Sequence, residues 1–83
     1  MGRVVALIKV FPESMEVFEE LKENIRREIN PARIDEEPVA FGFKALKVTV
    51  VMADEAGSGD IEEKIKKIKG ASEVEVVDVG RIS

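Results

Sequence analysis

The side chains that could do chemistry in this sequence are few, because its 83 residues include no Cys and no His. Zinc sites in proteins are built mostly from these two residues, and Ser or Cys nucleophiles usually depend on an imidazole base. Disulfide and iron–sulfur chemistry are excluded by the same composition. We therefore expect no cofactor, no metal site and no covalent catalysis, and residues that recognise a partner are the stronger candidates.

Two carboxylate-rich segments are the first candidates. The segment 35–37 (Asp-Glu-Glu) falls in an expected strand, where consecutive side chains point to alternate faces and do not converge on one ion. We expect it to be a solvated sheet edge. The segment 54–60 has glycines before a helix N-terminus, as phosphate sites do, but it lacks a P-loop lysine and carries three carboxylates. A loop followed by a helix cap is favoured there, with a weak calcium site left open.

The segment 40–44 (Ala-Phe-Gly-Phe-Lys) contains two of the four Phe residues, on either side of a glycine. The glycine favours a hairpin turn, and an aromatic side chain beside such a turn is available to a partner. Exposure is favoured for Phe41, whereas for Phe43 closure of the core and exposure are equally expected. RNA stacking is disfavoured, because the strand that follows presents Lys47 and Thr49 where RNA-recognition strands present aromatic rings.

Arg81 is the last basic residue and precedes only Ile82 and Ser83. By position alone these residues form a frayed terminus. An arginine at the end of a strand can also enter a partner's phosphate or carboxylate site, because its planar fork matches such oxyanions. Both interpretations stay open at this point.

Four strands are expected to position these residues. The β-branched run 4–11 predicts a central strand that ends at Pro12, since proline cannot donate to a sheet ladder. Residues 33–41 contain charges and Pro38, which predicts an edge strand. Residues 44–52 alternate apolar and polar side chains, so a hairpin near Gly42 should join them to the edge strand. A last strand is expected over 73–79.

Two helices are expected between the strands. The first follows Ser14 as its cap and is stopped by Asn30-Pro31. Asp60 and Glu63 resemble a capping box for the second helix, which Gly70 should end. Apolar residues recur at three- and four-residue spacing in both segments, and they are Met15, Phe18, Leu21, Ile25 and Ile29 in the first and Ile61, Ile65 and Ile68 in the second.

The expected order βαββαβ predicts an α+β fold, a single ferredoxin-like domain over residues 1–83 with both helices on one face of a four-stranded antiparallel sheet. In that topology Phe41 and Arg81 lie at opposite ends of the sheet, roughly 25 Å apart. A net charge of −4 disfavours nucleic acid as a partner, and no apolar run is long enough for a membrane span. We expect a cytoplasmic protein.

The sequence resembles the archaeal elongation factor 1-beta family nearly from end to end. The resemblance is carried by residues 4–14 (VVALIKVFPES), by 36–48 (EEPVAFGFKALKV) and by 74–76 (VEV) with a short basic tail. The central stretch is the specific one, because the pattern Pro-x-x-Phe/Tyr-Gly-x-Lys-x-Leu before the third strand is characteristic of this family and of the catalytic domain of its eukaryotic relatives.

The resemblance implies guanine nucleotide exchange on the translation GTPase elongation factor 1-alpha. It implies that Phe41, with Gly42, Phe43 and Lys44, docks on the second domain of the GTPase. It also implies that Arg81 and Ile82 enter the nucleotide domain and disturb the Mg²⁺ and phosphate-loop contacts. The sequence departs from the eukaryotic factors in carrying Arg81 where they carry Lys, in adding Ser83, and in lacking their N-terminal extension.

Two functions from other classes remain as alternatives. One is a ferredoxin-like ligand-binding or regulatory dimer that associates through the open sheet face, whose side chains would be Val5, Leu7, Phe11, Val51 and Val77. The other is an acylphosphatase-type enzyme, which is the more distant because the first βα loop offers Pro12-Glu13-Ser14 and no phosphate-cradling arginine.

Overall fold

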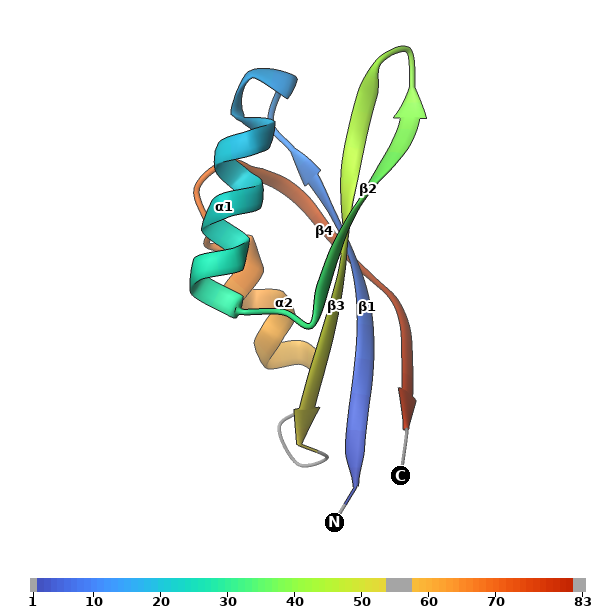
Figure 1. Cartoon of the computed structure of the whole chain (residues 1–83). Helices are drawn as coiled ribbons and strands as arrows, with labels where there is room; N and C mark the ends of the chain where they lie inside the picture. Colours follow the sequence, from blue (N-terminus) through green and yellow to red (C-terminus); the bar gives the residue numbers. More distant parts are fainter. Residues whose placement is uncertain (1, 54–57, 82–83) are drawn as a thin grey trace.

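The computed structural model describes residues 2–53 and 58–81 (Figure 1). A single turn of 3₁₀ helix, η1, precedes the first α-helix. The elements in chain order are β1 (Arg3–Pro12), η1 (Met15–Val17), α1 (Phe18–Ile29), β2 (Arg33–Ala40), β3 (Phe43–Ala53), α2 (Ser58–Lys66) and β4 (Ala71–Arg81).

The strands form one four-stranded sheet in the order β2-β3-β1-β4. Every neighbouring pair is antiparallel, so β1 and β2 run one way and β3 and β4 run back. The predicted ferredoxin-like α+β architecture is confirmed, as are the central place of β1 and the edge place of β2. Both helices pack on the same face of the sheet (Figure 1).

The core lies between the sheet and the helices, because alternate strand residues point toward the helices. Ala6, Ile8 and Val10 of β1 are buried on this face. Their partners across the ladder, such as Val50 opposite Ala6, are buried with them. The helices add the buried side chains Phe18, Leu21, Ile25 and Ile65, and Ile68 is buried in the turn that follows α2. Neither of the two described helices lies over the other face of the sheet, which we call the open face (Figure 1).

The expected helix boundaries differ from the observed ones at both N-termini and at the end of α2, which stops at Lys66 and not at Gly70. Ser14 is extended and its side chain makes no capping hydrogen bond. The backbone carbonyl of Ser14 instead accepts from the Val17 amide at 3.2 Å, so the 3₁₀ turn replaces the predicted side-chain cap. Asp60 lies inside the first turn of α2, where its charge complements the helix dipole, and is not the N-cap residue. The stop at Asn30 is confirmed: its backbone is left-handed and its amide donates to the Arg26 carbonyl.

The β2–β3 hairpin and the end of β4 lie at opposite ends of the molecule, whose longest extent is 41 Å (Figure 1). The hairpin projects beyond the end of the helix layer. Within the described part of the chain, neither helix is long and apolar enough to cross a membrane.

Candidate functional site

The hairpin tip is a two-residue turn with an aromatic side chain in an uncommon backbone conformation. Phe41 has φ = 44° and Gly42 has φ = 79°, and Ala40 pairs with Phe43 to close the turn. Positive φ at both central residues is the pattern of a type I′ turn, which favours Asn, Asp or Gly at its first position. A bulky residue there costs about 1 kcal/mol or more. The fold therefore holds Phe41 in place at an energetic cost.

The Phe41 side chain is fully exposed, with a relative accessibility of 108%. Val39 stands beside it at a register shift between Pro38 and Ala40 and is 46% exposed. The prediction of exposure for Phe41 is thus confirmed. Phe43, for which core and surface were equally expected, is half-buried. The tip presents an apolar surface that the rest of the chain leaves uncovered.

The base of the hairpin is held by a carboxylate shared between two lysines. Glu36 of β2 accepts from Lys22 of α1 at 2.8 Å and from Lys44 of β3 at 3.4 Å, each through a different oxygen. The hydrogen bonds from Lys22 and Lys44 lower the pKa of Glu36 below its ordinary value of 4.5. The backbone amide of Lys44 also donates to the Met15 sulfur at 3.4 Å. Lys44 is therefore fixed at both its backbone and its ammonium group.

A second ion pair braces the open face of the same hairpin. Lys9 of β1 lies 3.3 Å from Glu37 of β2, reaching past the intervening strand β3. Ala45, the residue opposite Glu37 on β3, is small and leaves room for this contact. Glu36 and Glu37 thus point to opposite faces, as the strand period requires. Their lysine partners were not predicted, because Lys22 lies 14 residues from Glu36 in the sequence and nothing local to either residue marks the pair.

Arg81 is the last residue of β4 and lies opposite Val4 of β1. The expectation that the last strand ends at Val79 is wrong: β1 begins at Arg3, and its first residues provide partners for Gly80 and Arg81. Arg81 shares the face of Val4, the helix side, whereas Gly80 opposes Val5 on the open face. Ile82, which the resemblance pairs with Arg81, lies outside the described residues, as does the segment 54–57 of the loop considered for calcium.

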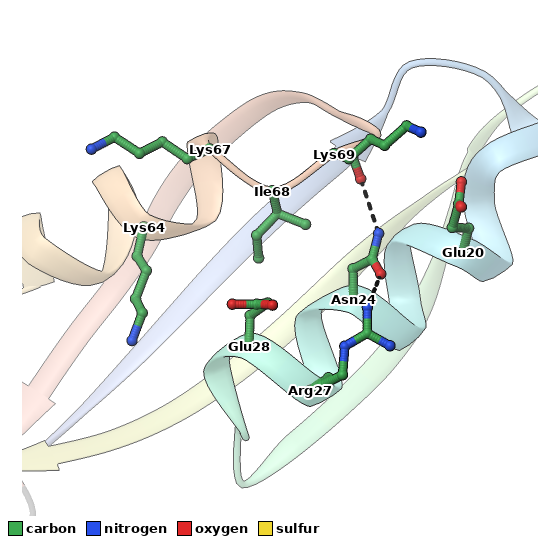
Figure 2. Close-up of a pocket in the computed structure, with 8 residues that line it drawn as sticks. All are labelled: Glu20, Asn24, Arg27, Glu28, Lys64, Lys67, Ile68 and Lys69. Atoms are coloured by element: carbon green, nitrogen blue, oxygen red, sulfur yellow. Dashed lines mark hydrogen bonds between the residues drawn. The ribbon is translucent and has the colours of Figure 1, made fainter.

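An open groove of about 490 Å³ lies between the two helices and contains none of the predicted site residues (Figure 2). Asn24 joins its walls, donating to the Lys69 carbonyl at 3.3 Å and accepting from Arg27 at 2.6 Å. Its charged lining residues have both signs, and they are Glu20, Arg27, Glu28, Lys64, Lys67 and Lys69. Within residues 2–53 and 58–81, no group of three or more acidic side chains could hold a metal ion.

The predicted residues therefore form two separate sites. The hairpin brings together Phe41, Gly42, Phe43 and Lys44 at one end, and Arg81 stands at the other. Nine residue steps along β3 separate the row of Phe43 from the row of Arg81, which is about 30 Å at about 3.3 Å per step. A partner that contacts both sites must span this distance.

Residues 5–82 match the EF-1 guanine nucleotide exchange domain. Among similar proteins, the elongation factor 1-beta of Methanothermobacter thermautotrophicus is 49% identical, with 99% of each chain covered. That of Methanosarcina barkeri is 48% identical over 99% of this chain and 100% of the relative. That of Staphylothermus marinus is 39% identical over the full length of both. The likeness extends from one site to the other and includes the strands between them.

Proposed function

We propose that this chain, which belongs to the EF-1 guanine nucleotide exchange domain family, exchanges GDP for GTP on elongation factor 1-alpha in the cytoplasm. The structural observation that supports this proposal is the fully exposed Phe41, held at an energetic cost at the far end of the sheet from Arg81. A long partner with two binding points accounts for both features.

The hairpin is the docking end. Phe41 supplies a flat ring whose two side-chain torsions cost little entropy on binding. Gly42 provides the turn through its positive φ, and the exposed Val39 widens the apolar contact. Lys44 adds a positive charge whose position is set by Glu36. Together these residues anchor the chain on the second domain of the GTPase.

The β4 end is the end that acts on the nucleotide site. Arg81 carries a charge that repels Mg²⁺ and a fork that competes for the phosphate-loop contacts, and Ile82 follows it. A factor that binds the nucleotide-free GTPase more tightly than the GDP-bound form weakens GDP binding by the same ratio. No bond is made or broken in this chain, so the process needs neither nucleophile nor general base.

Stopped-flow release of labelled GDP from the cognate elongation factor 1-alpha tests the proposal. We expect the protein to accelerate release with a rate that saturates with its concentration, and to leave GTP hydrolysis unchanged. Release that stays at its intrinsic rate at saturating protein would contradict it. A homodimer seen by sedimentation, with no effect on GDP release, would favour the alternative of a regulatory dimerisation domain.

A further inference from the structure

Met15 contacts the β2–β3 hairpin through a hydrogen bond that lies beyond the strand ladder. The register between β1 and β3 extends as far as Val10 opposite Leu46, and β1 ends at Pro12. Two residues nearer the turn on β3, the backbone amide of Lys44 donates to the Met15 sulfur at 3.4 Å. The Met15 side chain thus continues the hydrogen bonding of β3 past the point where β1 provides a partner.

The position of this contact relates it to the exposed aromatic ring. Lys44 follows Phe43, which closes the turn with Ala40, and it is three residues from Phe41. Met15 lies in η1 and packs, half-buried, against the hydrophobic core. One side chain therefore joins the core of the domain to the backbone beside the turn, in a hairpin that projects beyond the helix layer (Figure 1).

Packing alone does not require a sulfur at this position. Leucine has a similar volume to methionine and replaces it in cores at little cost, but it has no acceptor for a backbone N–H. We propose that Met15 is a positioning residue for the docking of the hairpin on elongation factor 1-alpha, because its sulfur fixes the direction in which the hairpin presents Phe41. The inference rests on the proposed function and extends it to a residue that the exposed tip does not include.

Met15→Leu removes the acceptor and keeps the apolar volume. Stopped-flow release of labelled GDP, measured over a range of protein concentrations, separates docking from the action on the nucleotide site. The half-saturating concentration should rise by about fivefold, which corresponds to about 1 kcal/mol, the net contribution of one hydrogen bond. The maximal rate should stay the same, because the Arg81 end is unchanged. The midpoint of thermal unfolding should change little.

Met15→Gln is the rescue variant, because its side chain has a similar length and its carbonyl oxygen can accept from the Lys44 amide. It should be less stable than Met15→Leu, since it places a polar amide against the core. Its half-saturating concentration should nevertheless stay close to that of the wild type. A residue that only filled the core would rank the two variants in the same order for stability and for docking, whereas a positioning residue ranks them in opposite orders.

Amide hydrogen exchange followed by NMR tests the contact without the GTPase. Exchange of the Lys44 amide should accelerate in Met15→Leu and slow again in Met15→Gln, while the amide of the buried Val48 on the same strand stays unchanged. Met52→Leu is the matched control, because Met52 packs half-buried against the same core toward the other end of β3. It should leave both the exchange of the Lys44 amide and the half-saturating concentration unchanged.

A half-saturating concentration for Met15→Leu equal to that of an active wild type would overturn the inference and leave the proposed function standing. An equal increase in Met52→Leu would also overturn it, because the effect would then come from the core and not from the hydrogen bond. A wild-type protein without effect on GDP release would overturn the proposed function and the inference together.

Discussion

Phe41 combines full exposure with a left-handed backbone, and each of these features alone works against stability. An exposed ring gains nothing from burial, and a left-handed Phe carries steric strain. An asparagine would suit the turn better, since its short polar side chain tolerates this conformation. The residue therefore has a cost in the free protein that only a bound state can offset.

Replacing Phe41 should separate stability from binding. Phe41→Ala should weaken binding to elongation factor 1-alpha by about 2 kcal/mol, roughly thirtyfold, because it removes an aromatic anchor. Phe41→Asn should weaken binding similarly and raise the melting temperature by a few degrees, because it relieves the backbone strain. Isothermal titration and thermal unfolding measure the two effects. A marked loss of stability in either variant would instead make the ring part of the structural framework.

Arg81 should affect exchange far more than it affects folding. Deleting residues 81–83 removes only the last described position of β4, so the free energy of unfolding should change by about 0.5 kcal/mol. Exchange should be lost, while the truncated chain still binds the GTPase through the hairpin and competes with the intact factor. Arg81→Lys should keep much of the activity and Arg81→Ala should lose most of it.

Lys67→Ala provides the control for charge alone, since it removes a positive charge in the groove between the helices (Figure 2). It should leave GDP release unchanged. If Arg81→Ala were as active as the wild type, the residue that acts on the nucleotide site would have to be sought elsewhere.

At the scale of elements, the β2–β3 hairpin is held by an ion pair on each of its two faces. Glu36 ties it to α1 through Lys22, and Glu37 ties it to β1 through Lys9. Exposed ion pairs of this kind contribute little to global stability. Their effect is local: they restrict the motion of a hairpin that projects past the helices, so less flexibility is lost when Phe41 binds.

The ion pairs of Glu36 give a pH dependence whose sign is fixed by its lowered pKa. A carboxyl with a lower pKa in the folded state contributes stability above its ordinary value of 4.5, and this contribution is lost as the pH falls through the folded pKa. Glu36→Gln should therefore differ from the wild type most above pH 4.5 and converge with it in acid, as followed by urea unfolding.

Lys22→Met tests the same linkage from the other partner. Removing the largest cause of the shift should raise the pKa of Glu36 toward 4.5, which carboxyl ¹³C titration by NMR can follow. An unchanged titration midpoint would mean that Lys22 does not hold this carboxylate in solution.

The elements themselves were predictable where the pattern is local, and their ends were less so. The β-branched apolar run of β1 and the spacings of three and four between apolar residues in α1 identified both elements. The starts of the helices depended on backbone hydrogen bonds that no side chain signals, as at Ser14. The true end of β4 depended on a partner more than 70 residues away, because Val4 pairs with Arg81.

The candidate site was also predictable only where the signal in the sequence is local. Phe41 and Arg81 were found from their residue types, their positions and a family resemblance, and topology gave their separation. The contacts of Lys22 with Glu36 and of Lys9 with Glu37 could not be predicted, because they depend on how the elements pack and on register across strands. A shift of one residue in the β2–β3 ladder would turn Glu36 and Glu37 to the opposite faces.

At the scale of the whole molecule, the two ends should contribute independently. They are about 30 Å apart by strand geometry, so the binding losses of Phe41→Ala and Arg81→Ala should add to within about 0.5 kcal/mol in the double variant. At saturating concentration, the maximal rate of GDP release should be the same for the double variant and for Arg81→Ala. Rates measured over a wide concentration range test both statements. Strong coupling between the two substitutions would contradict the proposal that the hairpin binds the GTPase and the Arg81 end acts on the nucleotide site.

Strand β3 runs without interruption from the hairpin turn to the row of Val51, so its length sets the distance between the two ends of the molecule. The distance between the two ends changes in steps of two residues. Adding two residues to each adjoining strand would lengthen it by about 7 Å and keep every side chain on its own face. Adding a single residue would instead turn the side chains at one end to the opposite face of the sheet relative to those at the other end. A partner that contacts both ends would therefore be matched by a count of residues, and that count can change only by even numbers.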